Sequence, residues 1–284
     1  MTYEISVNIN KSVLEPLGAV GQPSPVEAAL VQTLEGGRAA LPLLPDVAAQ
    51  ALDLANNPDS GVREFADLIN KDPPIAARFI ATANSALYSR GQTIRSVGDA
   101  VARIGLGASR DLVFQVVYAS TVSGLKAFQE EVQASFQRSV LCGIMCRVAA
   151  PLLRLNVADA YLCGLLHDIG ESRVYRILSE SKLQPNPEEA KLLVEKYHPR
   201  AGAELAMRWA LPDEIVQVCR RHEEKGPPTS DQLRLVRIAD LVVVHVKEQS
   251  EHPEFAPEAL QELSLSIEQA RTIIGRSIEA ASKV

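Results

Sequence analysis

The sequence predicts an all-α protein made of two packed helical subdomains. Hydrophobic residues make up 46% of the 284 residues, whereas aromatic residues make up only 5%, and alanine and leucine are frequent among the apolar positions. Beyond the first ten residues, the alternating Val, Ile and Thr runs that are typical of strands are few. Gly, Pro, Asn and Asp residues instead separate apolar segments of helical length.

Residues 1–40 are expected to form an N-terminal extension and linker. Apolar and polar residues alternate at the start, which predicts a short strand or an extended arm containing Tyr3, Ile5, Val7 and Ile9. Gly and Pro residues at 18–25 indicate a linker, a helix is expected at 26–34, and a Gly36-Gly37 break follows. The compact body is therefore expected to begin at Leu41.

The first subdomain is expected to span residues 41–125. Apolar residues follow helical spacing at 46–56, 62–70, 74–83, 97–104 and 108–122. Turn formers between Asn56 and Gly61, and prolines at 73 and 74, account for the breaks. We expect the polar residues at these helix ends to cap helices and to bond neighbouring helices, although loop groups also serve recognition: Asn70, Lys71, Asp72, Asn84, Ser85, Tyr88 and Arg103.

The second subdomain is expected to span residues 126–250. A long helical run is expected at 127–155, interrupted or ended near Ala150-Pro151. Further helices are expected at 188–197, 199–210, 213–223 and 232–249. Residues 251–284 form a C-terminal tail. Its apolar stripe at 267–281 predicts an amphipathic helix that covers the core or a second subunit.

An adjacent polar pair, His167-Asp168, stands in an apolar segment of this second subdomain. Leu162, Leu165, Leu166 and Ile169 recur around the pair at helical spacing, so a core helix is expected there. His and Asp are rarely buried without a partner. A metal ion, a phosphate group or an internal hydrogen-bond network could supply that partner.

Three further residues are candidates to meet this pair in space. His198 precedes Pro199, which predicts a position at a helix entrance, and His222 lies near the end of another expected helix. Asp240 lies in a strongly apolar helix, where a carboxylate must be paired, coordinated or protonated. Together with His167 and Asp168 they form a plausible shell for a divalent metal ion, which is the one candidate cofactor.

Composition argues against several other functions. A net charge of −6 and a pI near 5.5 weigh against general binding to nucleic acid, which needs an excess of Lys and Arg. The sequence holds no GxxxxGK[ST] phosphate loop. No CxxC pair occurs, so the cysteines are expected to be core residues: Cys142, Cys146, Cys163 and Cys219.

Neither a signal peptide nor a membrane-spanning segment is expected. The N-terminus lacks a basic region followed by an apolar core, and no run of about 18 apolar residues occurs. A cytoplasmic location is therefore expected by default.

The order of these polar residues resembles the HD superfamily of metal-dependent phosphohydrolases, and several further motifs resemble its HDOD branch, the HD-related output domain. The resemblance extends over about residues 41–246. It rests on Leu41-Pro-Leu-Leu-Pro45, Ile69-Asn-Lys-Asp72-Pro73-Pro-Ile-Ala-Ala-Arg78, Ala83-Asn84-Ser85-Ala-Leu-Tyr88-Ser89, Ile94-Arg-Ser-Val-Gly-Asp99-Ala-Val-Ala-Arg103-Ile-Gly105-Leu, His198-Pro-Arg-Ala-Gly202 and Trp209-Ala-Leu-Pro212.

This chain departs from the HD pattern at two places. Arg138 stands at the expected position of the first histidine ligand, and Glu171 follows His-Asp-Ile-Gly where the cyclic-dinucleotide-cleaving branch typically has Lys. The chain also lacks a Gly-Tyr-Pro motif. Arg138 removes a ligand and adds a cation, but it could also bind a phosphate group or pair with Asp168.

The resemblance implies an HD-like helical bundle as the second subdomain and a role in bacterial signalling, usually without hydrolysis. The expected partner is a signalling protein or a small ligand, with a homodimer as a further option. The alternative is a metal-dependent phosphohydrolase with an incomplete shell of His167, Asp168, Asp240, His198 and His222. A third reading, a nucleic-acid-binding regulator, rests on Arg220-Arg221, and the acidic balance weighs against it.

Overall fold

The computed structural model describes residues 23–36, 45–57, 60–85, 88–89, 91–123, 125, 127–248 and 268. All regular structure within these ranges is helical, which confirms the predicted fold class. The elements are α1 (Pro25–Glu35), α2 (Asp46–Asn56), α3 (Val62–Ile69), α4 (Pro73–Ala83), α5 (Val97–Ile104), α6 (Leu106–Val122), α7 (Gln129–Ala149), η2 (Ala150–Leu153), α8 (Val157–Leu166), α9 (Ile169–Glu180), α10 (Pro187–Arg208), α11 (Asp213–Arg221) and α12 (Asp231–Glu248).

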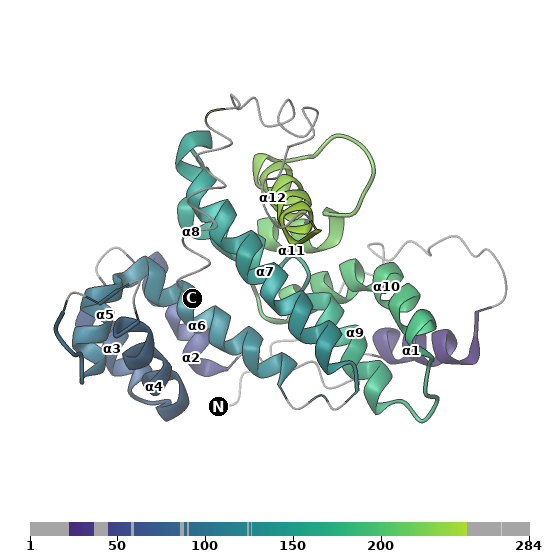
Figure 1. Ribbon diagram of the computed structural model, residues 1–284, viewed down its shortest axis with the longest axis horizontal. Coiled ribbons are helices and arrows are strands. Elements are labelled where there is room, and N and C mark those ends of the chain that lie inside the picture. Colours follow the sequence, from purple (N-terminus) through teal and green to yellow (C-terminus); the bar gives the residue numbers. More distant parts are fainter. Residues whose placement is uncertain are drawn as a thin grey trace, which may run out of the picture.

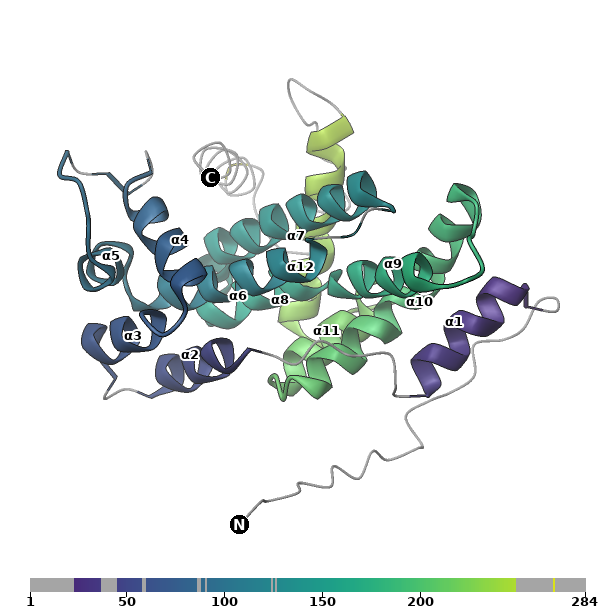
Figure 2. The ribbon, with the colours of Figure 1, turned by 90° about the horizontal axis from the view of Figure 1, so that it is seen from below.

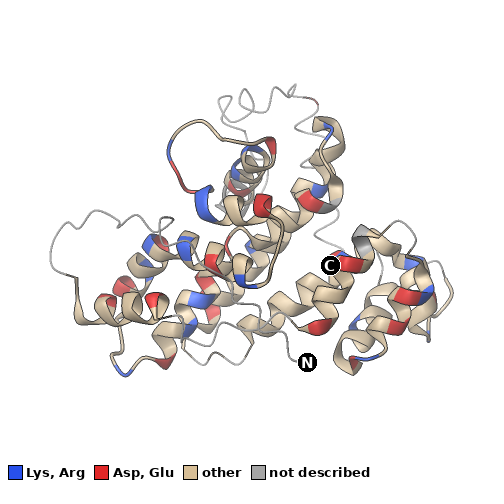
Figure 3. Cartoon of the chain, turned by 180° about the vertical axis from the view of Figure 1, so that it is seen from behind, with Lys and Arg blue, Asp and Glu red and all other residues tan. Residues whose placement is uncertain are grey.

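The helices form two groups that α6 and α7 connect (Figure 1). Helices α2–α5 lie at one end, and α9 and α10 lie at the other with α1 beside them (Figure 2). One large core joins both groups through α6, α7 and α8, and a smaller core joins α1, α9 and α10. Acidic and basic residues are interspersed along the helices (Figure 3).

Most predicted helices of the first subdomain are confirmed, and their ends show the expected capping. The Asp72 carboxylate accepts a hydrogen bond from the backbone N–H of Ile75 at 3.1 Å, at the start of α4. At the other end of α4, Asn84 accepts a bond from the Ile94 N–H at 2.8 Å and donates to the Ile80 and Ile94 carbonyls. These polar side chains thus connect α4 to the segment before α5.

Two predicted terminal elements lie outside the described residues. They are the strand or arm in residues 1–10 and, apart from residue 268, the amphipathic helix at 267–281. The bounds of the predicted subdomains stay a prediction.

The prediction of a continuous helix through His167-Asp168 is wrong. Helix α8 ends at Leu166, α9 begins at Ile169, and the pair forms the turn between them. His167 Nδ1 donates to the Gly164 carbonyl at 2.8 Å, so a side chain satisfies a carbonyl at the end of the helix. Asp168 has φ −99° and ψ 12°, which are not α-helical values. The break directs both side chains toward neighbouring helices.

The predicted helix entrance at His198 is also wrong, because α10 continues through Pro199. An internal proline removes one backbone hydrogen bond and costs about 3 kcal/mol. Contacts with α9 offset this cost: Arg173 donates to the Ala201 carbonyl at 2.8 Å and forms an ion pair with Glu204 at 2.9 Å. Tertiary packing therefore overrides the local preference.

Glycine residues allow α9 and α10 to touch backbone to backbone. A β-carbon added at Gly170 would overlap the His198 carbonyl oxygen and would lie 2.5 Å from the Gly202 nitrogen. Helices α7 and α8 meet in a similar way, because a β-carbon at Gly164 would lie 2.8 Å from the Cys142 carbonyl oxygen. These contacts fix the positions of the helices that surround the His167-Asp168 turn.

Helix α1 lies on α9 and α10 through both apolar and polar contacts. It buries Val26, Leu30 and Leu34 in the smaller core. The Glu27 carboxylate accepts hydrogen bonds from Lys196 at 2.7 Å and from the Tyr197 hydroxyl at 2.8 Å. Both bonds lower the pKa of Glu27, and the bond from Lys196 has the larger effect.

One helical stretch among the described residues is long and apolar enough to span a membrane by composition. It is Gln129–Leu153, which combines α7 and η2, with a mean hydropathy of 1.2. Half of that window is buried inside the protein, where α7 packs on α8, α9 and α12. A core helix of a helical bundle gives the same signal.

Replacement of Gly170 tests the contact between α9 and α10. We expect Gly170→Ala to lower the free energy of unfolding by about 3 kcal/mol, because the new methyl group overlaps backbone atoms that cannot move independently. Gly98→Ala is the matched control, since nothing lies within 4 Å of the added carbon. We expect the control to leave stability unchanged or to raise it by up to about 1 kcal/mol. Urea unfolding measures both, and equal stabilities would contradict this account.

Candidate functional site

The structure brings all six sequence-predicted site residues together around the turn between α8 and α9. Asp168 and His167 come from the turn itself, and the others come from four different helices or helix ends. We name the assembly, together with Glu171, the His-Asp cluster: Arg138 (α7), His167, Asp168, Glu171 (α9), His198 (α10), His222 (end of α11) and Asp240 (α12).

Asp168 lies at the centre of the cluster and is 3% exposed. Its Oδ2 atom accepts a hydrogen bond from Arg138 at 3.0 Å and lies 3.3 Å from His167 Nε2. Its Oδ1 atom lies 3.0 Å from His222 Nε2 and 3.5 Å from His198 Nε2. A buried carboxylate is costly unless it is paired, and here four side chains share its charge.

Backbone carbonyls fix the orientation of all three histidine rings. The Nδ1 atoms of His167 and His198 lie 2.8 and 2.9 Å from the carbonyls of Gly164 and Val194, and His222 Nδ1 lies 3.0 Å from the Cys219 carbonyl. A carbonyl oxygen can only accept, so each Nδ1 carries a proton. The Nε2 atoms therefore face the centre of the cluster, in the orientation that metal-binding histidines adopt.

His198 and His222 approach one another closely. Their Nε2 atoms are 3.0 Å apart, and two unprotonated lone pairs at this distance repel. A proton or a cation must therefore lie between these atoms. Burial, opposed by the charge of Asp168 and reinforced by the neighbouring His222, lowers the pKa of His198 to about 4.

The prediction that Arg138 could pair with Asp168 is confirmed, and the pairing extends further. Arg138 Nη2 also lies 2.7 Å from Glu171 Oε1, and Nε lies 3.9 Å from Asp240 Oδ1. Burial opposes the charge on Arg138, but the carboxylates of Glu171, Asp168 and Asp240 raise its pKa. One guanidinium thus faces three carboxyl groups.

Sequence reasoning did not assign Glu171 to the site. Its position three residues after Asp168, in the first turn of α9, was the available signal. Burial and the charge of Asp168 raise the pKa of Glu171 to about 7, although Arg138 opposes the rise. Tyr118 was missed as well, and its buried hydroxyl lies 3.4 Å from the Asp168 carbonyl.

Asp168 and His167 each favour the charged form of the other. Burial disfavours ionisation of Asp168, but His167 and His222 outweigh this effect and hold the pKa of Asp168 well below its usual range. Burial likewise disfavours a charged His167, yet Asp168 raises the pKa of His167 above its usual range.

Two polar atoms in the cluster lack a hydrogen-bond partner among the described residues. They are His167 Nε2 and Asp240 Oδ1, which are buried and 3.4 Å apart. Two sets of ligand atoms each lie within 4.8 Å of one another, namely Asp168 with His198 and His222, and Asp168 with His167 and Asp240. Nitrogen and carboxylate ligands of this type fit a divalent metal ion such as Zn²⁺, whereas Arg138 competes for the same carboxylates.

The four cysteines do not join this set. All are buried, which confirms the prediction that they are core residues. Burial raises the pKa values of the Cys142, Cys163 and Cys219 thiols.

A family model described as the HDOD domain matches residues 41–225. The chain belongs to the HDOD family. The match includes every member of the His-Asp cluster except Asp240. The predicted resemblance is therefore confirmed.

Solved structures with the same fold include another HDOD protein. An HDOD domain protein with unknown function from Geobacter sulfurreducens is 25% identical, with a TM-score of 0.63 over 89% of this chain and 90% of that one. A candidate metal-dependent phosphohydrolase from Shewanella amazonensis is 24% identical, with a TM-score of 0.64 over 90% and 97% of the two chains. The similarity to the Shewanella amazonensis protein shows a shared fold alone.

Curated relatives are longer than this HDOD protein. An uncharacterized protein from Treponema pallidum is 24% identical over 195 residues, which are 64% of this chain and 37% of that protein. Ribonuclease Y from Desulfotalea psychrophila is 34% identical over 112 residues, which are 39% and 18% of the two chains. This chain thus spans well under half of either relative.

The tautomers of the three histidines can be measured directly. We expect two-bond ¹H–¹⁵N NMR spectra at pH 7 to show a protonated Nδ1 in His167, His198 and His222, because each faces a carbonyl oxygen. The opposite tautomer prevails for neutral histidine in solution, so histidines elsewhere in the chain provide the internal reference. A cluster histidine protonated at Nε2 alone would contradict the geometry.

Proposed function

We propose that this HDOD protein is a bacterial signal-transduction module that acts by binding a protein partner or a small ligand, without catalysis. The observation that carries the proposal is the position of Arg138, which forms ion pairs with Asp168 and Glu171 and lies near Asp240. These carboxyl groups would otherwise be available to a metal ion. The His-Asp cluster is then an internally neutralised structural core.

Electrostatics supports this assignment. A divalent ion near Asp168 and Asp240 would lie within a few ångströms of the Arg138 guanidinium, and like charges in a poorly hydrated site repel strongly. Removal of either partner from a buried ion pair leaves an uncompensated charge, which typically costs about 3–5 kcal/mol. Displacement of Arg138 by a metal is therefore unfavourable unless the guanidinium can reach solvent.

A metal-dependent phosphohydrolase is the second candidate function. His167 Nε2 and Asp240 Oδ1 favour it, because these buried atoms lie 3.4 Å apart and have no hydrogen-bond partner among the described residues. His167, Asp168 and Asp240 would hold the ion, with His198 and His222 beside them. A bound metal would hold phosphate and activate water. Ribonuclease Y, a relative over part of the chain, carries a hydrolase name, and catalytic metals tolerate open coordination positions.

The expected partner is a signalling protein, and a second copy of this chain is the alternative. Nucleic acid fits less well, because the net charge is −6 and Arg221 is engaged with Glu224 at 2.8 Å. The cytoplasmic location and the bacterial source belong to the proposal and rest on the sequence and its resemblance. Light scattering of the purified chain distinguishes monomer from dimer.

Exchange of Arg138 for the missing ligand tests the proposal. After incubation with Mn²⁺ or Zn²⁺ and desalting, we expect the natural protein to retain substoichiometric metal. Arg138→His should retain stoichiometric metal, because the change removes a cation and adds a ligand. Elemental analysis measures the metal, and bis(p-nitrophenyl) phosphate reports turnover on the same samples.

Two control variants separate charge from ligation. Arg138→Gln removes the charge without adding an imidazole, and Arg208→His adds an imidazole at an exposed position on α10. Stoichiometric metal with turnover in the natural protein, both lost in His167→Ala and Asp240→Ala, would establish the hydrolase instead. Metal without turnover would contradict the role of Arg138 while leaving the absence of catalysis intact.

A further inference from the structure

A second candidate site is a cavity of about 230 Å³ between helices α4–α6 on one side and helices α7 and α8 on the other. One wall comes from α4, the segment that follows it, the end of α5 and α6, and the other comes from α7 and α8. No residue of the His-Asp cluster lines it. By volume it could hold about eight water molecules, which is also the scale of a small organic molecule.

The cavity is positively charged although the chain as a whole is negative. The charged residues that line it are Arg78, Arg147 and Asp111, two cations against one anion. A third cation, Arg110, lies behind the wall and is 2% exposed. Asp111 forms ion pairs with two arginines, at 3.0 Å with the buried Arg110 and at 2.5 Å with the half-buried Arg147. A single carboxylate thus leaves an excess of positive charge in a partly desolvated place.

Two of these cations have unused hydrogen-bonding capacity. Arg147 Nε is buried and has no hydrogen-bond partner among the described residues. Arg78 is exposed at the cavity, and no ion pair or hydrogen bond involves it within the part of the chain that the structure describes. Guanidinium groups bind carboxylate and phosphate oxygens through two parallel hydrogen bonds. These groups would therefore suit an anion.

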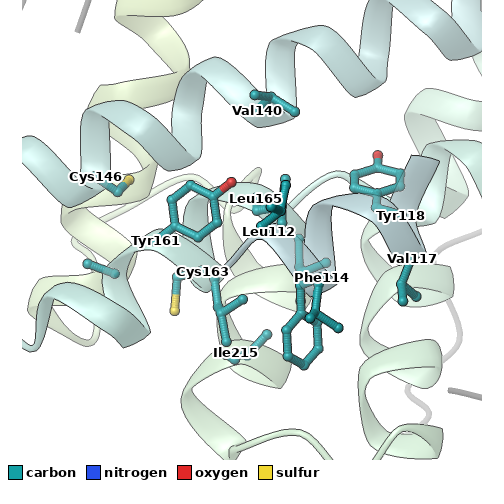
Figure 4. Packing of buried hydrophobic residues seen from close by; sticks show 14 of the residues in the cluster. Leu112, Phe114, Val117, Tyr118, Val140, Cys146, Tyr161, Cys163, Leu165 and Ile215 are labelled. Atoms are coloured by element: carbon teal, nitrogen blue, oxygen red, sulfur yellow. The ribbon is translucent and has the colours of Figure 1, made fainter. Parts of the chain in front are cut away.

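The remainder of the lining is apolar and aromatic. The Arg147 guanidinium lies over the Tyr161 ring at 4.1 Å from its centroid, which holds the cation in a fixed orientation. Leu112, Val140 and Tyr161 come from three different helices (Figure 4). Thr82, Ser85 and Gln115 add a few polar groups, as is usual for small-molecule sites.

We propose that this cavity binds a small organic anion that carries one carboxylate or phosphate group on a flat apolar body. The anionic group contacts Arg78 and Arg147, and the apolar body lies against Tyr161 and Leu112. The inference goes beyond the proposed function, because it assigns a ligand class to a place outside the His-Asp cluster. The inference does not depend on whether the His-Asp cluster binds a metal ion.

The cavity is also positioned to influence the His-Asp cluster. Arg147 and Arg138 lie on the same helix, α7, nine residues or about 13.5 Å apart along its axis. Helix α7 packs on α8, which leads directly into the His167-Asp168 turn. A ligand held between α4, α6 and α7 therefore contacts the same helix that carries Arg138.

Binding can be tested with simple probes on the full chain. Phenyl phosphate and benzoate combine an anionic group with a flat ring. Inorganic phosphate supplies the anionic group alone, and phenol supplies the ring alone. We expect calorimetry to show that the combined probes bind at least tenfold more tightly than either half. Methyl NMR should show shifts at Ile104 and Ile144, which line the cavity, and not at Ile215, which does not.

Variants locate the anionic group. We expect Arg78→Ala and Arg147→Gln each to weaken phenyl phosphate binding about tenfold, the typical effect of one charge-assisted hydrogen bond. Arg78 is exposed, so its variant should fold even if the Arg147 variant does not. Arg208→Ala, an exposed arginine outside the cavity, is the matched control and should leave affinity unchanged.

Several outcomes would overturn the inference. They are the absence of binding by both combined probes, equal affinity in Arg78→Ala and the natural protein, and shifts confined to residues outside the cavity. Loss of binding in Arg138→Gln with no loss in Arg78→Ala would assign the anion to the His-Asp cluster instead. The metal analysis of that cluster is a separate measurement, so either proposal can fail alone.

Discussion

The unfavourable burial of one carboxylate, Asp168, determines how the second subdomain is arranged. An isolated carboxylate in this environment would be protonated or would destabilise the fold by several kcal/mol. Side chains from α7, α10 and α11 must therefore meet it, in addition to its neighbour His167. The same arrangement suits a metal centre or a metal-free core, and in the function proposed above the charge of Arg138 favours the metal-free core.

Close helix packing is what allows these side chains to converge. The absence of a side chain at Gly170 lets the backbone of α10 approach α9 at His198, and Gly164 does the same between α8 and α7. With larger residues the helices would separate, and the Nε2 atoms could not reach Asp168. The geometry of the polar His-Asp cluster therefore depends on the two glycines.

Local signals in the sequence predicted much of this structure. Residues such as Asp72 and the proline after it determine where a helix begins, because their effects act within one turn. The break at His167-Asp168 and the continuity of α10 through Pro199 depend on contacts between helices, so local rules failed there. The candidate metal ligands were evident from residue type, whereas the role of Glu171 and the cavity at Arg147 required three-dimensional packing.

The attachment of α1 has a consequence for synthesis on the ribosome. Glu27 is bound by Tyr197, which lies 170 positions later in the chain. At elongation rates of roughly 5–20 residues per second, α1 is synthesised about 10–30 s before Tyr197. Over most of that interval the apolar stripe of Val26, Leu30 and Leu34 lacks the residues of α9 and α10 with which it shares a core, because those helices begin at Ile169 and Pro187. The nascent chain therefore presents a helix that chaperones can hold before it is buried.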